Sequence, residues 1–280
     1  AQDIYEPKKV GVDQIIIDGV LSPGEWENAV EVIIDFEVNP GNNIPAKTET
    51  KGYISYSDKY LFVAFYAKGD PNNIRASVRS RDDFGMIGDD FVLVRFDTYA
   101  DGRNNFLLLS NPFGSQLDAR AINALTDEER YDVSFNLDYK TKGKIVEDGY
   151  QVEFKIPFSS IPFPSGKNQI WNFNLTRQYF KDGNTIDTRS QPFDRTNTCQ
   201  VCQTTDRLVL KDIVFEGRIE LLPFIAGSQS GERLKRNGVL KYNKFKPNTG
   251  LGLNLDLNKN SSLELTLNPD FSQVEADVSQ

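Results

Sequence analysis

The chain has 280 residues, of which 39% are hydrophobic and 26% charged, enough for one large β domain or a domain with a smaller companion. The formal net charge of −8 argues against nucleic acid as the main partner, because phosphate binding needs a basic face. The sequence contains no histidine, which excludes a Ser-His-Asp triad, a histidine-liganded zinc site and an imidazole general base.

Segments rich in β-branched and aromatic residues follow one another along the first 180 residues, and polar turn sequences separate them. About one turn of helix is expected before them, because Ser22 is an N-cap residue followed by a proline. Strands at this spacing predict an antiparallel β-sandwich. The predicted strands span residues 30–38, 51–57, 60–67, 89–98, 104–110, 149–157 and 170–178.

The two cysteines of the chain, Cys199 and Cys202, form a CxxC motif. Such a motif can be a redox pair, half of a zinc site or a small disulfide loop. Zinc would need two further ligands, and the sequence has no other Cys and no His to supply them. No helical pattern surrounds the motif, as a thioredoxin-like site would require. We therefore expect a local structural disulfide or an inert pair.

The pattern changes after about residue 217, where longer runs alternate between leucine and polar residues. The runs approach the roughly 9–11 residues with which a tilted strand crosses a bilayer. They fit a lipid-facing hairpin and equally an amphipathic hairpin packed on the sandwich. The basic stretch 233–246 fits a solvated hairpin loop, a site for anionic lipid headgroups, or both. The leucines of the two runs are Leu251, Leu253, Leu255 and Leu257, then Leu263, Leu265 and Leu267.

No stretch approaches the roughly 20 apolar residues of a transmembrane helix. The opening "AQD" lacks a methionine, which fits a mature N-terminus left by signal-peptide cleavage as well as an arbitrary boundary. The final predicted strand has no evident partner after it, so we expect further strands from a longer polypeptide or from another chain.

The stretch "IIIDGVLSPGEWENAV" at residues 15–30 resembles the opening of family 9 carbohydrate-binding modules, a DOMON-like fold. Later strand sequences, among them "DDFVLVRFDT" and "DGYQVEFKIPF", are similar to the family's central strands. The tail "TLNPDFSQVEAD" resembles the junction in large outer-membrane proteins of Bacteroidota, which carry such a module ahead of a β-barrel. The resemblance implies a β-sandwich at residues 1–217 and the first strands of an outer-membrane β-barrel at 218–280.

Sugar-binding modules of this family hold their ligand between two exposed tryptophans. This chain has only Trp26 and Trp171, and the positions of both favour core packing. Other aromatic side chains would then have to stack on a sugar, and Arg and Asp in the loop "RSRDDFGMIGDD" could bind its hydroxyls or a carboxylate. The predicted ligand-binding residues are Arg79, Arg81, Asp82, Phe84 and Tyr179.

Related modules also bind structural calcium, and the resemblance makes Asp89, Asp90 and Asp97 candidate ligands. Their spacing does not match an EF-hand loop. The alternative is a solvated loop with surface ion pairs.

The resemblance implies a non-catalytic domain that binds a glycan or another envelope component and assists uptake, secretion or envelope assembly. Its expected place is the outer membrane of a Gram-negative bacterium, with the sandwich on the periplasmic or surface side. Envelope polysaccharide, outer-membrane lipid and other outer-membrane proteins are the expected partners. One alternative is an accessory subunit that binds another protein. The other is a glycoside hydrolase, which needs two carboxylates roughly 5–9 Å apart, and the sequence singles out no such pair.

Overall fold

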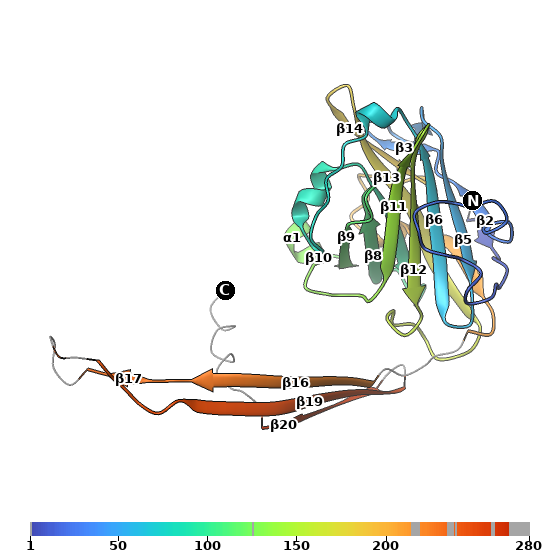
Figure 1. Ribbon diagram of the computed structural model, residues 1–280. Coiled ribbons are helices and arrows are strands. Elements are labelled where there is room, and N and C mark those ends of the chain that lie inside the picture. Colours follow the sequence, from blue (N-terminus) through green and yellow to red (C-terminus); the bar gives the residue numbers. More distant parts are fainter. Residues whose placement is uncertain are drawn as a thin grey trace. The chain divides into compact units, whose positions relative to one another are not determined.

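The computed structural model describes residues 2–124, 126–213, 219–233, 238, 240–258 and 261–268. The chain divides into two compact units, residues 1–215 and 216–280 (Figure 1). The first unit is an antiparallel β-sandwich, which confirms the predicted fold class. In the part of the chain that is described, no helix is both long enough and apolar enough to cross a membrane.

The larger sheet of the first unit has ten strands in the order β10-β9-β8-β7-β13-β14-β3-β4, with β15 beside β13 and β1 beside β15. All its neighbours are antiparallel except β1 and β15. Its strands are β1 (Ile4–Tyr5), β3 (Phe36–Asn39), β4 (Ile44–Pro45), β7 (Phe91–Asp97), β8 (Asn104–Ser110), β9 (Gln116–Ile122), β10 (Tyr131–Asp132), β13 (Gln169–Lys181), β14 (Asn184–Arg189) and β15 (Asp206–Leu210).

The smaller sheet has five antiparallel strands in the order β11-β12-β6-β5-β2. They are β2 (Val30–Ile33), β5 (Thr50–Tyr56), β6 (Tyr60–Lys68), β11 (Lys140–Val146) and β12 (Gly149–Pro157). Short helical turns lie in the connections: η1 (Pro71–Asn73), η2 (Phe84–Gly88), α1 (Asp127–Arg130) and η3 (Val201–Gln203).

Two local predictions were wrong. The expected strand 30–38 is two strands, because β2 pairs with β5 in the smaller sheet while β3 pairs with β14 in the larger one. The expected helical turn after Ser22 is a non-helical turn, in which Glu25 instead accepts hydrogen bonds from the backbone of Ile16 and Ser22.

The main core fills the space between the two sheets. Every second residue of β6 and β13 points into it, as period-2 alternation requires. Trp171 is 0% exposed and meets Phe96 edge-to-face at 5.7 Å between ring centres, so its predicted core position is confirmed.

A smaller cluster covers the outer face of the smaller sheet, where Trp26 packs against Phe62 and Ala64. Trp26 Nε1 donates to the buried carboxylate of Glu153 at 3.1 Å, and the backbone N–H groups of Asp18 and Gly19 donate to the same carboxylate at 2.9 and 2.8 Å. The Asp-Gly-x-Leu…Trp motif, Asp18 to Trp26, therefore covers this outer face and surrounds one buried acid. Burial raises the pKa of Glu153 to about 7.

The second unit contains a three-stranded antiparallel sheet, β16-β19-β20, and a two-stranded ribbon, β17-β18. The register sets Leu251 opposite Leu267, and Leu253 opposite both Leu221 and Leu265. One face of the three-stranded sheet is therefore apolar from edge to edge. The strands are β16 (Ile219–Ser228), β17 (Gly231–Glu232), β18 (Lys241–Tyr242), β19 (Lys246–Asn258) and β20 (Ser261–Leu267).

We call this surface the leucine face, and much of it is exposed: Leu221 is 60% exposed and Leu267 is 67% exposed. Polar residues such as Asn254 and Glu264 share the opposite face with Leu222 and Phe224. Residues 259–260 between the two leucine runs, part of the basic stretch and the tail 269–280 lie outside the described residues. The leucine face consists of Ile219, Leu221, Pro223, Ile225, Leu251, Leu253, Leu255, Leu263, Leu265 and Leu267.

Candidate functional site

The larger sheet is apolar on its outer face as well as its core face. In β7, Val92 and Val94 point into the core, while Phe91 and Leu93 belong to a separate apolar cluster outside it. An outer sheet face is usually polar, so apolar residues there indicate a surface that is covered or that binds something. The outer cluster contains Met86, Phe91, Leu93, Leu107, Leu109, Leu117, Ala119, Ala121 and Val201.

A groove of about 320 Å³ opens over this outer face, and we call it the outer groove. Phe84 and Ile87 of η2 line it and are 51% and 52% exposed. Tyr131 and Val133, around β10, line it as well and are 36% and 38% exposed. The floor is apolar, and polar side chains come from β7, β13 and β14: Arg95, Thr176, Gln178, Asp187 and Arg189.

Two of the predicted ligand-binding residues hold the loop that carries Phe84. Arg79 donates from Nε and Nη2 to both oxygens of the buried Asp89, at 2.8 and 3.0 Å. Asp83 accepts from the backbone N–H of Gly85 at 2.8 Å and caps η2. Arg81 donates to the buried carboxylate of Asp118 at 2.6 Å. The guanidiniums of Arg79 and Arg81, which were predicted to bind a ligand, therefore form ion pairs within the protein.

The remaining predicted ligand-binding residues have three different surroundings. Phe84 lines the outer groove. Asp82 has a left-handed backbone (φ 61°) and pairs with Arg81 at 3.5 Å. Tyr179 is only 6% exposed and lies under the guanidinium of Arg177, so the expectation of an exposed stacking ring there was wrong.

The three candidate calcium ligands have separate protein partners. Asp89 binds Arg79, and Asp90 accepts from the backbone N–H of Phe180 at 3.1 Å. Asp97 accepts from the backbone N–H of Gly102 at 2.8 Å. The structure does not bring the three together, and the described residues contain no group of three or more Cys, Asp or Glu that could hold a metal ion.

Cys199 and Cys202 are joined by a disulfide, with 5.5 Å between their Cα atoms. The bond closes a short loop at η3, and the Cys202 sulfur lies 3.5 Å from the carbonyl oxygen of Gly102.

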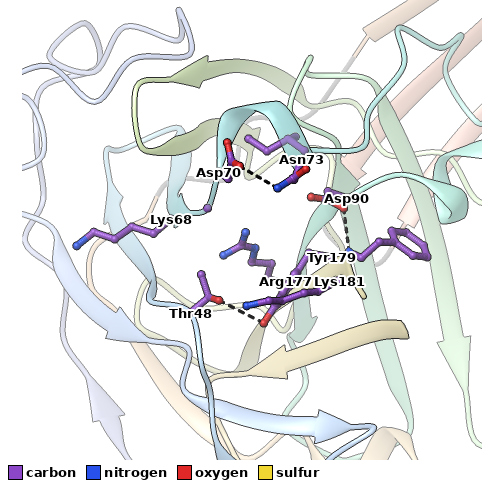
Figure 2. Close-up of a pocket in the computed structure, with 11 residues that line it drawn as sticks. Thr48, Lys68, Asp70, Asn73, Asp90, Arg177, Tyr179 and Lys181 are labelled. Carbon is purple, nitrogen blue, oxygen red and sulfur yellow. Dashed lines mark hydrogen bonds between the residues drawn. The ribbon is translucent and has the colours of Figure 1, made fainter. Parts of the chain in front are cut away.

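A second, polar pocket of about 190 Å³ lies where Lys68, Asp70, Asp90 and Lys181 meet, and we call it the end pocket (Figure 2). Arg177 lines it and is 2% exposed. Figure 2 shows the guanidinium of Arg177 in the middle of the lining residues.

Three basic and two acidic side chains line the end pocket. Arg177 donates to Thr50 Oγ1 at 2.9 Å and lies against the rings of Tyr150 and Tyr179. Burial raises the pKa of Asp90 to about 6, and the Arg177 charge partly opposes this. The outer groove has an apolar floor and the exposed ring of Phe84, whereas Tyr179 of the end pocket is buried, so we take the outer groove as the candidate functional site.

Sequence reasoning found Phe84 but missed Arg95, Thr176, Gln178, Asp187 and Arg189. They come from three strands that are neighbours only in the folded sheet, in the order β7-β13-β14. The arginines within apolar strands, in "FVLVRFD" and "NTIDTR", were the available signal.

A scan against protein-family models found no match, and no curated protein matches the chain. Several solved structures are similar to the chain. One is a family 9 carbohydrate-binding module from Caldicellulosiruptor kristjanssonii in complex with cellotriose, with 17% identity and a TM-score of 0.50, covering 76% of this chain and 95% of that one. Another is a candidate carbohydrate-binding protein from Bacteroides uniformis, with 12% identity and a TM-score of 0.55, covering 75% and 99%. The chain therefore contains a sandwich with the fold of family 9 carbohydrate-binding modules.

Proposed function

We propose that the first unit is a non-catalytic glycan-binding module and that the outer groove is its sugar site. The observation that carries this proposal is the groove itself, with an apolar floor, two aromatic side chains and a cluster of hydrogen-bonding groups. Sugar rings present apolar faces that stack on aromatic rings, while their hydroxyls need directed donors and acceptors. The similar fold of a module bound to cellotriose supports the proposal.

A hydrolytic role fits the outer groove poorly. A glycosidase places two carboxylic acids on either side of the bond that it cleaves. Asp187 is the one carboxylate among the described residues that line the groove. We therefore infer binding without cleavage.

The test is calorimetric titration of the whole chain, in a non-ionic detergent, with cellotriose and other oligosaccharides. Phe84→Ala should weaken binding at least about tenfold if the ring stacks on a sugar. Phe113→Ala is the matched control, because Phe113 is 45% exposed on a loop and does not line the groove, so its loss should leave affinity unchanged. Equal affinities for the two variants, or no affinity for any oligosaccharide, would contradict the proposal.

We further propose that the second unit contributes strands to an outer-membrane β-barrel and that the leucine face meets lipid. This localisation rests on the register of β16, β19 and β20, which aligns apolar side chains on one face across three strands. Transmembrane barrels show the same alternation of apolar-out and polar-in residues. In lipid, the outer edges of β16 and β20 would need partner strands, from a longer polypeptide or from another chain.

The proposal is tested by mixing the whole chain with lipid vesicles and digesting with protease. Protection of the strands β16, β19 and β20, together with digestion of the connection 229–245 between β16 and β19, is the expected result. Complete digestion of the second unit in vesicles would contradict a membrane role. A module anchored in this way would bring glycan to the outer membrane, on its periplasmic or surface side.

A further inference from the structure

Two arginines, Arg95 and Arg189, are among the polar residues that line the outer groove. Arg95 belongs to β7 and Arg189 to β14, and both strands pair with β13 between them. The register places Arg95 opposite Asn174 and Arg189 opposite Thr176, so the two arginines flank neighbouring segments of the same strand. Both line the groove.

These guanidiniums are poorly compensated inside the protein. Arg95 is 7% exposed, and the Nε atoms of Arg95 and Arg189 are buried without a hydrogen-bond partner. Neither residue is among the arginines that form ion pairs in the described part of the chain. Burying a charge without a counter-charge is costly, which distinguishes this pair from Arg79 and Arg81.

The groups around the pair leave an excess of positive charge. Asp187 is the one carboxylate that lines the groove, and burial raises its pKa. Arg95 and Arg189 repel each other, and burial together with this repulsion lowers the pKa of Arg189 to about 9.

The other neighbours of the pair supply no second anion. Tyr131 lies beside Arg95, and the ring of Phe193 lies 3.6 Å from the guanidinium carbon of Arg189. The Asp132 carboxylate is already paired with Arg120 at 3.0 Å. Among the described residues that line the groove, two arginines therefore face one carboxylate.

We infer that the outer groove binds an acidic glycan, with the carboxylate of a uronic acid residue held by Arg95 and Arg189. This inference rests on the proposed function and names its ligand class. A guanidinium presents parallel N–H donors that match the two oxygens of a carboxylate. The aromatic rings of Phe84 and Tyr131, in the same groove, are available to the apolar face of the sugar. A bound uronate supplies the negative charge that the protein lacks at this point.

The test compares oligogalacturonate with cellotriose as ligands of the whole chain in a non-ionic detergent. Wild type should bind oligogalacturonate more tightly, and this preference should shrink as salt is added. Arg189→Gln should reduce the ratio of the two affinities at least about tenfold, because one charge-assisted pair of hydrogen bonds is lost. Arg189→Lys keeps the positive charge but lacks the paired N–H donors of a guanidinium. It should therefore restore part of the preference for oligogalacturonate over cellotriose.

Arg207→Gln is the charge-matched control, because Arg207 is exposed on β15 and does not line the groove. It should leave both affinities unchanged, and circular dichroism should show that every variant is folded. Cellotriose binding as tight as oligogalacturonate binding, or an unchanged ratio in Arg189→Gln, would overturn the inference and leave the proposed function intact. Absence of binding to oligogalacturonate, cellotriose and every other oligosaccharide would overturn both.

Discussion

The strands of the first unit bury apolar side chains, whereas the three-stranded sheet of the second unit leaves an apolar face exposed. In β7, Val94 and Phe96 are 0% exposed between the sheets. In β16 and β20, Leu221 and Leu267 are 60% and 67% exposed. The same period-2 alternation is thus present in both units, so alternation alone does not tell a protein core from a lipid-facing surface.

The first prediction compares truncations in the two units. Phe154→Ala empties part of the core and should lower the free energy of unfolding of the first unit by about 3–5 kcal/mol. Leu265→Ala removes a side chain that is already 48% exposed, and should change the stability of β16-β19-β20 in water by less than about 0.5 kcal/mol. Denaturant titration of tryptophan fluorescence reports on the first unit, and amide hydrogen exchange of β19 reports on the second. A large effect of Leu265→Ala in water would show that the leucine face is part of a core.

The second prediction places a charge on either face of β19. Leu253 and Asn254 are neighbours in sequence and point to opposite faces of the sheet. Leu253→Arg should weaken partitioning into lipid vesicles by about 2–4 kcal/mol, while Asn254→Arg should cost much less, because charge is unfavourable only toward lipid. Vesicle flotation measures both. Equal losses for the two variants would contradict a lipid-facing leucine face.

Much of the sandwich could be predicted from sequence, because its long strands are rich in β-branched and aromatic residues and are separated by recognisable turns. Among the strands of five or more residues in the first unit, the prediction missed β9, β11, β14 and β15. β11, with the sequence "KTKGKIV", lacks a continuous apolar run, and it owes its place to pairing with β12 along its whole length. Tertiary pairing of this kind overrides local β-propensity.

The candidate site was less predictable than the fold. The sequence predicted a ligand site in a polar loop rich in Arg and Asp. In the structure, Arg79 and Arg81 form ion pairs with the buried acids Asp89 and Asp118. The groups that face the outer groove, such as Arg95 and Arg189, lie far apart in sequence and meet only through the order of the strands. The spacing of these residues in the sequence does not predict that they are close together in the folded sheet.

The third prediction concerns the end pocket and pH. Burial raises the pKa of Asp90 from 3.8 to about 6, so its protonation favours the folded state. The stabilisation is complete below pH 3.8, the ordinary pKa, and is lost as pH rises through about 6. When the pH is lowered from about 7 to about 4, the free energy of unfolding of wild type should therefore rise by at most about 3 kcal/mol relative to that of Asp90→Asn. Thermal unfolding of both proteins across this range measures the difference, and a gap that does not change with pH would contradict the prediction.

The smallest expected effect concerns the acid beneath the Asp-Gly-x-Leu…Trp motif. Trp26→Phe keeps an aromatic ring on the outer face of the smaller sheet but removes the Nε1–H donor to Glu153. Loss of this donor should lower the free energy of unfolding by about 1–2 kcal/mol above pH 7, where the carboxylate is ionised, because the buried charge then accepts one hydrogen bond fewer. The cost should shrink below the Glu153 pKa of about 7, since the protonated acid depends less on that donor. Trp171→Phe is the comparison, because Trp171 Nε1 is buried without a partner and its loss should carry no such pH dependence. Parallel pH profiles for the two variants would mean that Trp26 stabilises the outer face of the smaller sheet by packing alone.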